Sequence, residues 1–246
     1  MMGFLRSRKI VKQPQLPEGI RIYALGDIHG RYDLLKEMFT VIDADMARNP
    51  VERPIEVFLG DYIDRGPDSA HTLDLLLDRS FHRETVFLKG NHEAFFLEVL
   101  GNPAKLEDWR QFGGLQTLMS YGLQPSLNPD AAEQTNLINA LLKAMPRDHL
   151  SFLKDLKPSF TCGDFFFVHA GVRPGIPLKE QQENDLLWIR NEFLDSEENF
   201  GKFIVHGHTP VQKPDIRPNR INIDTGAYAT GNLTLLTIQG SSMLAV

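Results

Sequence analysis

The sequence is poor in cysteine: its 246 residues include one, Cys162. An intramolecular disulfide is therefore impossible, and no metal cluster held by several thiolates can form. This usage fits a reducing compartment. Cys162 also falls in an expected hairpin turn, so we do not expect it to act as a nucleophile.

The sequence also lacks long apolar runs, and none approaches the roughly 20 residues of a membrane-spanning helix. The basic cluster Arg6, Arg8 and Lys9 is not followed by the apolar segment and cleavage site of a signal peptide. The net charge of −6 argues against a nucleic-acid footprint over the whole domain. We therefore expect a cytoplasmic protein that binds neither membranes nor nucleic acids.

The chain shows no internal repeat and no low-complexity tract. Hydrophobic residues make up 42% of it and charged residues 24%, which is typical of a globular protein. We expect residues 1–16 to form a flexible N-terminal tail and residues 17–246 to form a single domain.

Five apolar runs rich in β-branched and aromatic residues predict buried strands. They cover residues 20–25, 55–59, 85–88, 165–168 and 203–205. Further strands are expected at 159–162, 221–223 and 233–238. Amphipathic spacing predicts helices at 31–46, 69–77 and 93–100, and then a helical block at 105–121, 130–144 and 147–156. This alternation indicates an α/β fold, and we interpret the helical block as an insert packed on the same core.

Each of the five runs is followed by a polar motif. The motifs are Gly26-Asp27-Ile28-His29-Gly30, Gly60-Asp61-Tyr62-Ile63-Asp64-Arg65-Gly66, Gly90-Asn91-His92-Glu93, Val168-His169-Ala170-Gly171 and Gly207-His208-Thr209-Pro210. Sites in open α/β sheets gather beyond the carboxyl ends of strands. The motifs offer the carboxylate, imidazole and amide ligands that transition metals use, so they predict one shared site.

The spacing within the motifs supports this hypothesis. Asp27 and His29 stand two apart on an extended segment, so both side chains point to one side. The Asp61 carboxylate can bridge two ions, Asn91 offers a neutral oxygen, and His92 can serve as a proton donor. Each motif alone has an ordinary structural explanation, such as a turn or a capping aspartate, and the complete set carries the prediction.

In order and spacing, the five motifs resemble those of the PPP-type metallophosphoesterases, the Ser/Thr protein phosphatases with a calcineurin-like fold. The resemblance runs from about Ile20 to Ile238. It is closest to the short bacterial and phage branch, through Gly207–Pro210 and Ile223-Asp-Thr-Gly-Ala227. It implies a calcineurin-like β-sandwich flanked by helices, with the helical insert at about 100–157.

The resemblance also implies roles for individual residues. Asp27 and His29 would bind a first metal ion and Asp61 would bridge to a second, whose other ligands would be Asn91, His169 and His208. His92 would protonate the leaving group and be held by Asp64, while Arg65 and Arg190 would contact phosphate. His206 is interpreted as a residue that either supports a metal ligand or packs at the end of its strand. The sulfur-free ligand set suits two divalent ions, with manganese favoured and iron or zinc as alternatives.

The expected function is dephosphorylation of phosphoserine and phosphothreonine in a protein substrate, by direct attack of a metal-bridging hydroxide. The alternative is a dinucleoside-tetraphosphate hydrolase of the same fold. Those relatives typically lack the acidic residue of Asp-Arg-Gly and end the third motif in Asp, so Asp64 and Glu93 favour the phosphatase. A catalytically inactive binding module would lack a ligand, and none is missing. The oligomeric state stays open.

Overall fold

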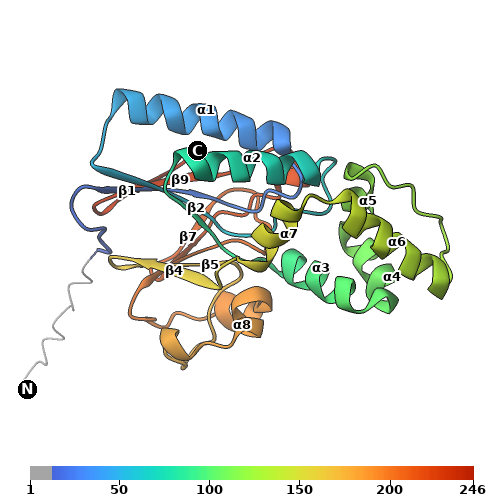
Figure 1. Ribbon diagram of the computed structural model, residues 1–246. Coiled ribbons are helices and arrows are strands. Elements are labelled where there is room, and N and C mark those ends of the chain that lie inside the picture. Colours follow the sequence, from blue (N-terminus) through green and yellow to red (C-terminus); the bar gives the residue numbers. More distant parts are fainter. Residues whose placement is uncertain (1–12) are drawn as a thin grey trace, which may run out of the picture.

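The computed structural model describes residues 13–246 (Figure 1). Residues 1–12 of the predicted tail lie outside the described residues. In the remainder, Leu16 is buried and its amide donates to the Gly240 carbonyl at 2.9 Å. The Gln15 amide donates to the Asp164 carboxylate at 3.1 Å. The chain therefore packs against the protein before the predicted boundary at residue 17.

The strands of the described chain form two mixed sheets. The first has the order β10-β9-β1-β2-β3, with β1 at Ile20–Leu25, β2 at Arg53–Phe58, β3 at Thr85–Phe87, β9 at Leu235–Gln239 and β10 at Ser242–Ala245. The second has the order β4-β5-β6-β8-β7, with β4 at Ser159–Cys162, β5 at Phe165–Val168, β6 at Phe203–His206, β7 at Asp215–Ile216 and β8 at Arg220–Asn222. In each sheet three neighbouring strands run parallel: β1, β2 and β3 in the first, and β5, β6 and β8 in the second.

Side-chain alternation along the strands builds a core on both faces of the first sheet. Ile22, Ala24 and Val57 face the second sheet, where Phe167 and Val205 belong to the same buried cluster. The intervening residues Tyr23, Leu25 and Phe58 join a separate cluster with the helices. Both faces of these strands are covered, which explains why they read as continuous apolar runs.

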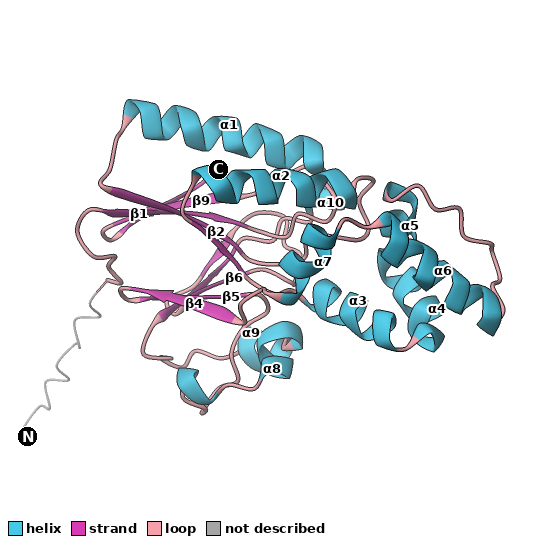
Figure 2. Ribbon diagram, viewed as in Figure 1, coloured by secondary structure: helices cyan, strands magenta, loops and turns pink. Residues whose placement is uncertain are grey.

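Helices cover the outer faces of the sandwich (Figure 1). Above the first sheet in this view lie α1 at Tyr32–Arg48 and α2 at Ser69–His82. Below the second sheet lie α8 at Glu183–Trp188 and α9 at Asn191–Leu194 (Figure 2). They pack on it through Leu186 and Phe193, together with Ile189 from the link between them. The short segment η3 at Leu178–Glu180 packs on the same cluster as α8 through Leu178, and α10 at Ala227–Thr230 joins the core of the first sheet through Ala227. The predicted α/β sandwich flanked by helices is confirmed.

The predicted helical insert lies beyond one end of the sandwich (Figure 1). It follows α3 at Asn91–Gly101 and comprises η1 at Pro103–Lys105, α4 at Leu106–Trp109, a π-helical turn η2 at Arg110–Gly114, α5 at Leu115–Ser120, α6 at Ala131–Ala144 and α7 at Arg147–Lys154. The prediction of one continuous helix over 105–121 is wrong. Gly113 has a φ of 104°, which only glycine adopts freely, and it breaks the helix there.

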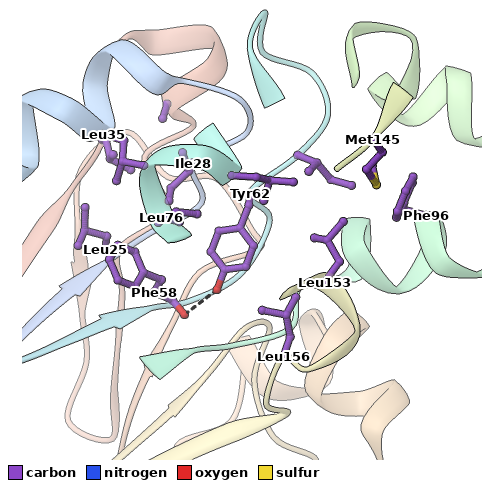
Figure 3. Close-up of a cluster of buried hydrophobic side chains, with 14 of the residues drawn as sticks. Leu25, Ile28, Leu35, Phe58, Tyr62, Leu76, Phe96, Met145, Leu153 and Leu156 are labelled. Atoms are coloured by element: carbon purple, nitrogen blue, oxygen red, sulfur yellow. Dashed lines mark hydrogen bonds between the residues drawn. The ribbon is translucent and has the colours of Figure 1, made fainter. Parts of the chain in front are cut away.

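The insert shares its core with the first sheet. Figure 3 shows Tyr62 between Phe58 of β2 and Phe96 of α3, with Leu153 of α7 beside it. The Tyr62 hydroxyl donates to the Leu88 carbonyl at 2.7 Å and also lies 3.2 Å from the Phe58 carbonyl. This continuous packing holds the insert against the loops that follow the strands.

The sequence patterns missed the edge strands β7 and β10. The first has two residues, and the second carries few apolar side chains that alternate toward a core. Among the described residues, no helix has the length and apolar content needed to cross a membrane.

Candidate metal centre

The five motif loops follow β1, β2, β3, β5 and β6, and they meet beyond the carboxyl ends of these strands. Their backbone is unusual. Within residues 13–246, positive φ values at non-glycine residues occur at His29, Asp61, Asp64, Arg65 and His208, and all five belong to these loops. Such conformations cost of order 1–3 kcal/mol each, and they persist only where the surroundings hold them. Their concentration here marks this edge as the candidate site.

Two groups of buried side chains at this edge could each hold a metal ion. One consists of His29, Asp61 and His92, and the other of Asp61, His169 and His208. In each group the ligand atoms lie within 4.8 Å of one another. Asp61 belongs to both groups, as its predicted bridging role requires. The Asn91 side-chain oxygen lies 2.9 Å from His169 Nε2 and 2.8 Å from His208 Nδ1, so Asn91 faces the second group.

The protonation of two histidines shows that these groups fit a cation. His29 Nδ1 lies 2.9 Å from the Ile63 carbonyl, and His169 Nδ1 lies 3.0 Å from the Leu59 carbonyl. Because a carbonyl only accepts, each Nδ1 is assigned the proton. Burial lowers the pKa of His29 to about 3 and also lowers that of His169, so both rings are neutral.

The Nε2 atom of each ring therefore carries a lone pair. Both Nε2 atoms lie 3.5 Å from Asp61 Oδ2, and Nε2 of His169 also faces the Asn91 oxygen. Lone pairs that converge in a buried space repel one another unless a positive ion lies between them. The backbone carbonyls that fix the tautomers are the kind of partner that metal-bound histidines use.

Asp27 lies in neither group. Its carboxylate accepts from the His208 backbone amide at 3.1 Å. Burial raises the pKa of Asp27 well above its usual value, and the carboxylates of Asp224 and Asp61 raise it further. Asp224 is a buried acid of the Ile223–Ala227 stretch, to which the sequence analysis assigned no role. Three buried carboxylates in one place favour a positive ion, which would lower the cost of ionising them.

Arg190 reaches the second group. Its Nε donates to His208 Nε2 at 3.2 Å, which assigns the ring proton to Nδ1, facing Asn91. To offer Nδ1 to a cation, His208 must move that proton to Nε2, and Nε2 could then no longer accept from Arg190. Cation binding by His208 Nδ1 would therefore free the Arg190 guanidinium for another partner.

His92 has one engaged and one free nitrogen. Nδ1 donates to Asp64 Oδ2 at 2.8 Å. Nε2 is buried, has no hydrogen-bond partner, and lies 3.9 Å from Asp61 Oδ2. Burial lowers the pKa of His92, but the Asp61 and Asp64 carboxylates outweigh it and raise this pKa above its usual value. Nε2 is therefore available to a hydrogen-bond acceptor that binds at the centre.

A model of the calcineurin-like phosphoesterase family matches residues 20–235. The chain belongs to this family. The predicted PPP-type, calcineurin-like membership is thereby confirmed, and with it a metal-dependent phosphoesterase. The family implies divalent metal ions, and the buried His and Asp groups suit them.

Two curated relatives and one solved structure show the range of this family. Bis(5'-nucleosyl)-tetraphosphatase PrpE of Anoxybacillus flavithermus is 26% identical over 231 residues, 86% of this chain and 88% of the relative. Serine/threonine-protein phosphatase 2 of Escherichia coli is 28% identical over 233 residues, 89% of this chain and 93% of the relative. A crystal structure provisionally assigned as a diadenosine tetraphosphatase matches with a TM-score of 0.61 at 20% identity, covering 92% of each chain. That structural likeness shows the fold alone.

In this phosphoesterase, three aromatic rings border the buried histidines. Phe112, Trp188 and Tyr228 are 42%, 37% and 39% exposed. Their centroids lie 6.2 Å from that of His92, 6.2 Å from that of His208 and 5.4 Å from that of His29, respectively. The Arg65 guanidinium lies 5.0 Å from the centre of the Tyr228 ring. The centre therefore lies directly behind a surface that solvent reaches.

His206 lies outside both groups. It is buried, its ring packs edge-on against Phe193, and its Nδ1 lies 3.2 Å from the Gly207 carbonyl. Burial lowers the pKa of His206 to about 3, so the ring is neutral. This position suits the predicted packing role.

Sequence reasoning missed the structural role of Glu93. Its Oε2 accepts from the amides of Asp61 at 2.9 Å and Gly90 at 3.0 Å. Its Oε1 accepts from the amides of Tyr62 at 2.8 Å and Ile63 at 3.3 Å. One buried carboxylate thus ties the second motif loop to the third. The signal was available, because Glu93 stands at the third position of α3, where glutamate caps helices.

Proposed function

We propose that this phosphoesterase hydrolyses phosphoserine and phosphothreonine in phosphorylated proteins. The observation that carries the proposal is the free Nε2 of His92, a member of the first group whose Nδ1 is held by Asp64. A serine oxygen is a poor leaving group unless it is protonated. An imidazole that is held at one ring nitrogen can supply that proton from the other.

We also propose the ligands of the metal ions. Asp27 and His29 would hold the first ion, and Asn91, His169 and His208 the second, with Asp61 bridging both. Two divalent ions supply Lewis-acid activation of water and neutralisation of phosphate charge when bound. The donors are nitrogen and oxygen without sulfur, which suits manganese.

The chain's own residues would act as follows. A water oxygen bonds to phosphorus and releases one proton to solvent, and the bond from phosphorus to the serine oxygen breaks. His92 Nε2 gives its proton to that oxygen, which leaves as a hydroxyl. Asp64 stays ionised and keeps Nδ1 in place, and His92 then regains a proton from solvent. The products are the serine side chain and hydrogen phosphate.

Two arginines would bind the phosphoryl oxygens. Arg65 lies in the second motif loop, and Arg190 contacts His208. A guanidinium offers a planar pair of donors that matches two phosphate oxygens. Because cation binding at His208 would release Arg190, loading the centre would also prepare this phosphate contact.

The second candidate is hydrolysis of dinucleoside tetraphosphates, which the name of the Anoxybacillus flavithermus relative favours. There the leaving group is a nucleotide phosphate, which is stable as an anion and needs less help from an acid. The two candidates therefore differ in how strongly the rate depends on His92.

The test is the His92→Asn variant, measured on a phosphoserine peptide, p-nitrophenyl phosphate and a dinucleoside tetraphosphate. General-acid catalysis is worth about 10²–10⁴-fold. We expect a loss in that range on the peptide and a clearly smaller loss on the aryl phosphate, whose phenolate leaves unaided. A faster wild-type turnover of the tetraphosphate than of the peptide would instead favour the second candidate.

His149→Asn is the matched control. His149 is also buried and also pairs with a carboxylate, Asp74, at 2.9 Å, but it lies in α7 of the insert. The His149→Asn variant should lose stability, and any loss of activity should be equal on the peptide and the aryl phosphate. An equal loss on the peptide and the aryl phosphate in His92→Asn, with the metal content retained, would overturn the acid role.

A further inference from the structure

The Asp64 carboxylate holds more than His92. Its Oδ2 accepts from His92 Nδ1 at 2.8 Å and from the Trp109 indole N–H at 2.9 Å. Its Oδ1 accepts from the Thr117 hydroxyl at 2.6 Å. All four side chains are fully or almost fully buried. Both carboxylate oxygens are therefore fixed by donors, and two of the three donors come from the insert.

The backbone beside Asp64 is held by the same insert. The Asp64 amide donates to Thr117 Oγ1 at 2.9 Å and to Ser69 Oγ at 3.1 Å. The Arg65 amide donates to the Gly113 carbonyl at 3.0 Å. Asp64 and Arg65 are consecutive residues with φ of 70° and 65°, a region that non-glycine residues leave unless they are held. These contacts supply that restraint.

The direction of the Thr117 hydroxyl follows from its partners. Its oxygen accepts from the Asp64 amide and lies 2.9 Å from Ser69 Oγ. Because the Asp64 carboxylate can only accept, the single Thr117 proton is assigned to Asp64 Oδ1, and Ser69 is then the donor to Thr117. Thr117 is thus hydrogen-bonded to both the backbone and the side chain of Asp64. Trp109 adds a donor on the oxygen that also holds His92. Neither Thr117 nor Trp109 contacts His92 through a hydrogen bond of its own, so both act on His92 through Asp64, whose carboxylate they orient and stabilise.

We propose that Trp109 and Thr117 are positioning residues, which fix the Asp64 carboxylate and through it aim His92 Nε2 at the leaving oxygen. The helical insert thereby takes part in the chemistry without touching substrate. The inference rests on the proposed acid role of His92. The competing explanation is that the two hydrogen bonds only fasten the insert to the domain.

Threonine 117 allows a clean test, because valine has its shape without the hydroxyl and serine keeps the hydroxyl. A small misplacement of a catalytic group can cost about 10²-fold in rate. We expect Thr117→Val to lower kcat on a phosphoserine peptide by about that factor and kcat on p-nitrophenyl phosphate by less than about threefold, with KM unchanged. Thr117→Ser should stay near wild type on both substrates. Trp109→Phe should show the same substrate dependence as Thr117→Val.

Thr72→Val is the matched control. Thr72 is a buried threonine of the neighbouring helix α2, and its hydroxyl donates to the Asp68 carbonyl at 2.7 Å instead of to Asp64. It should lose comparable thermal stability with an unchanged ratio of peptide to aryl phosphate rates. Metal content by mass spectrometry should equal wild type in every variant.

Several results would overturn the inference. One is an equal loss on both substrates in Thr117→Val and Trp109→Phe, which means that the hydrogen bonds only stabilise the fold. Another is a Thr117→Ser variant as impaired as Thr117→Val. His92→Asn separates this failure from that of the proposed function. If it shows the substrate dependence and Thr117→Val does not, the positioning role alone is wrong. If neither shows it, the acid role is wrong and the inference falls with it.

Discussion

The buried carboxylate of Glu93 offers the sharpest test of how the motif loops are held. We predict that Glu93→Gln strongly destabilises the protein, although the side chains are nearly identical in shape. Each Glu93 oxygen accepts from two backbone amides, Oε2 from Asp61 and Gly90, and Oε1 from Tyr62 and Ile63. Glutamine keeps one oxygen and turns the other into an NH₂ donor.

The magnitude follows from the amides that lose their acceptor. Whichever way the glutamine amide is turned, two buried N–H groups face a donor. A buried polar group left without a partner costs about 1–3 kcal/mol, so the pair costs about 2–6 kcal/mol. Domains are stable by about 5–15 kcal/mol in total, so this is a large fraction. Asp61 should also shift, because its amide is one of the four.

The assay is urea unfolding of the metal-free protein, so that changes in metal binding do not enter the comparison. Glu133→Gln is the control. Glu133 occupies the same capping position in α6, where it accepts from the Asp130 amide at 2.9 Å, but it is exposed. Because water can replace that contact, the control should change stability by no more than about 0.5 kcal/mol.

A cost below about 1 kcal/mol would refute this reasoning, since one unsatisfied buried amide alone should exceed it. Burial and the Asp61 carboxylate raise the pKa of Glu93 to about 8, although His92 and the amides of Ile63 and Tyr62 lower it, and this rise favours the protonated acid. The four amides favour the carboxylate. A small cost would mean that Glu93 is held as the neutral acid, which glutamine imitates.

Two further predictions concern metal. Exhaustive chelation should abolish phosphatase activity and Mn²⁺ should restore it. Asp61→Asn should be the most impaired ligand variant, because Asp61 belongs to both groups. Full activity in protein that elemental analysis shows to be metal-free would contradict this prediction. His208→Ala should bring bound metal toward one equivalent per chain while His206→Ala keeps two, because His206 faces Phe193 and lies outside the groups. Native mass spectrometry measures both, and the reverse pattern would move the ligand assignment to His206.

The gathering of the motifs could be predicted from sequence because it follows from strand geometry. Parallel strands bring their carboxyl ends to one edge, so motifs that follow such strands must meet there. Asp27 and Asp61 come together for this reason, whereas the meeting of Asp61 with His169 also depends on how the two sheets stack. The helix at 31–46 was predicted within two residues of the observed Tyr32–Arg48, since its apolar spacing is regular.

Contacts made by the insert could not be predicted in this way. Trp109 and Thr117 reach Asp64 from 45 and 53 residues further along the chain. Whether these two side chains contact Asp64 depends on the angle at which the insert leaves α3 and on the packing around Tyr62. Amphipathic spacing shows which face of a helix is buried, but it does not show which polar atom on that face meets which partner. Asp224 lies in the Ile223–Ala227 stretch, but its place beside Asp27 could not be predicted, because Asp27 follows a strand far away in the sequence.

The break at Gly113 is a local sequence feature that bears on the contact between the insert and the second motif loop. A continuous helix over 105–121 would use the Gly113 carbonyl within its own hydrogen-bond ladder, and the Arg65 amide would lose its partner. The positive φ at Gly113 releases that carbonyl toward Arg65, and a side chain at position 113 would collide with the Arg65 backbone. Gly114 in turn leaves room for the Trp109 ring. Two adjacent glycines inside a helical pattern violate local propensity, and such violations are expected where a distant site depends on them. The glycine pair was therefore the available sign that this insert reaches the metal centre.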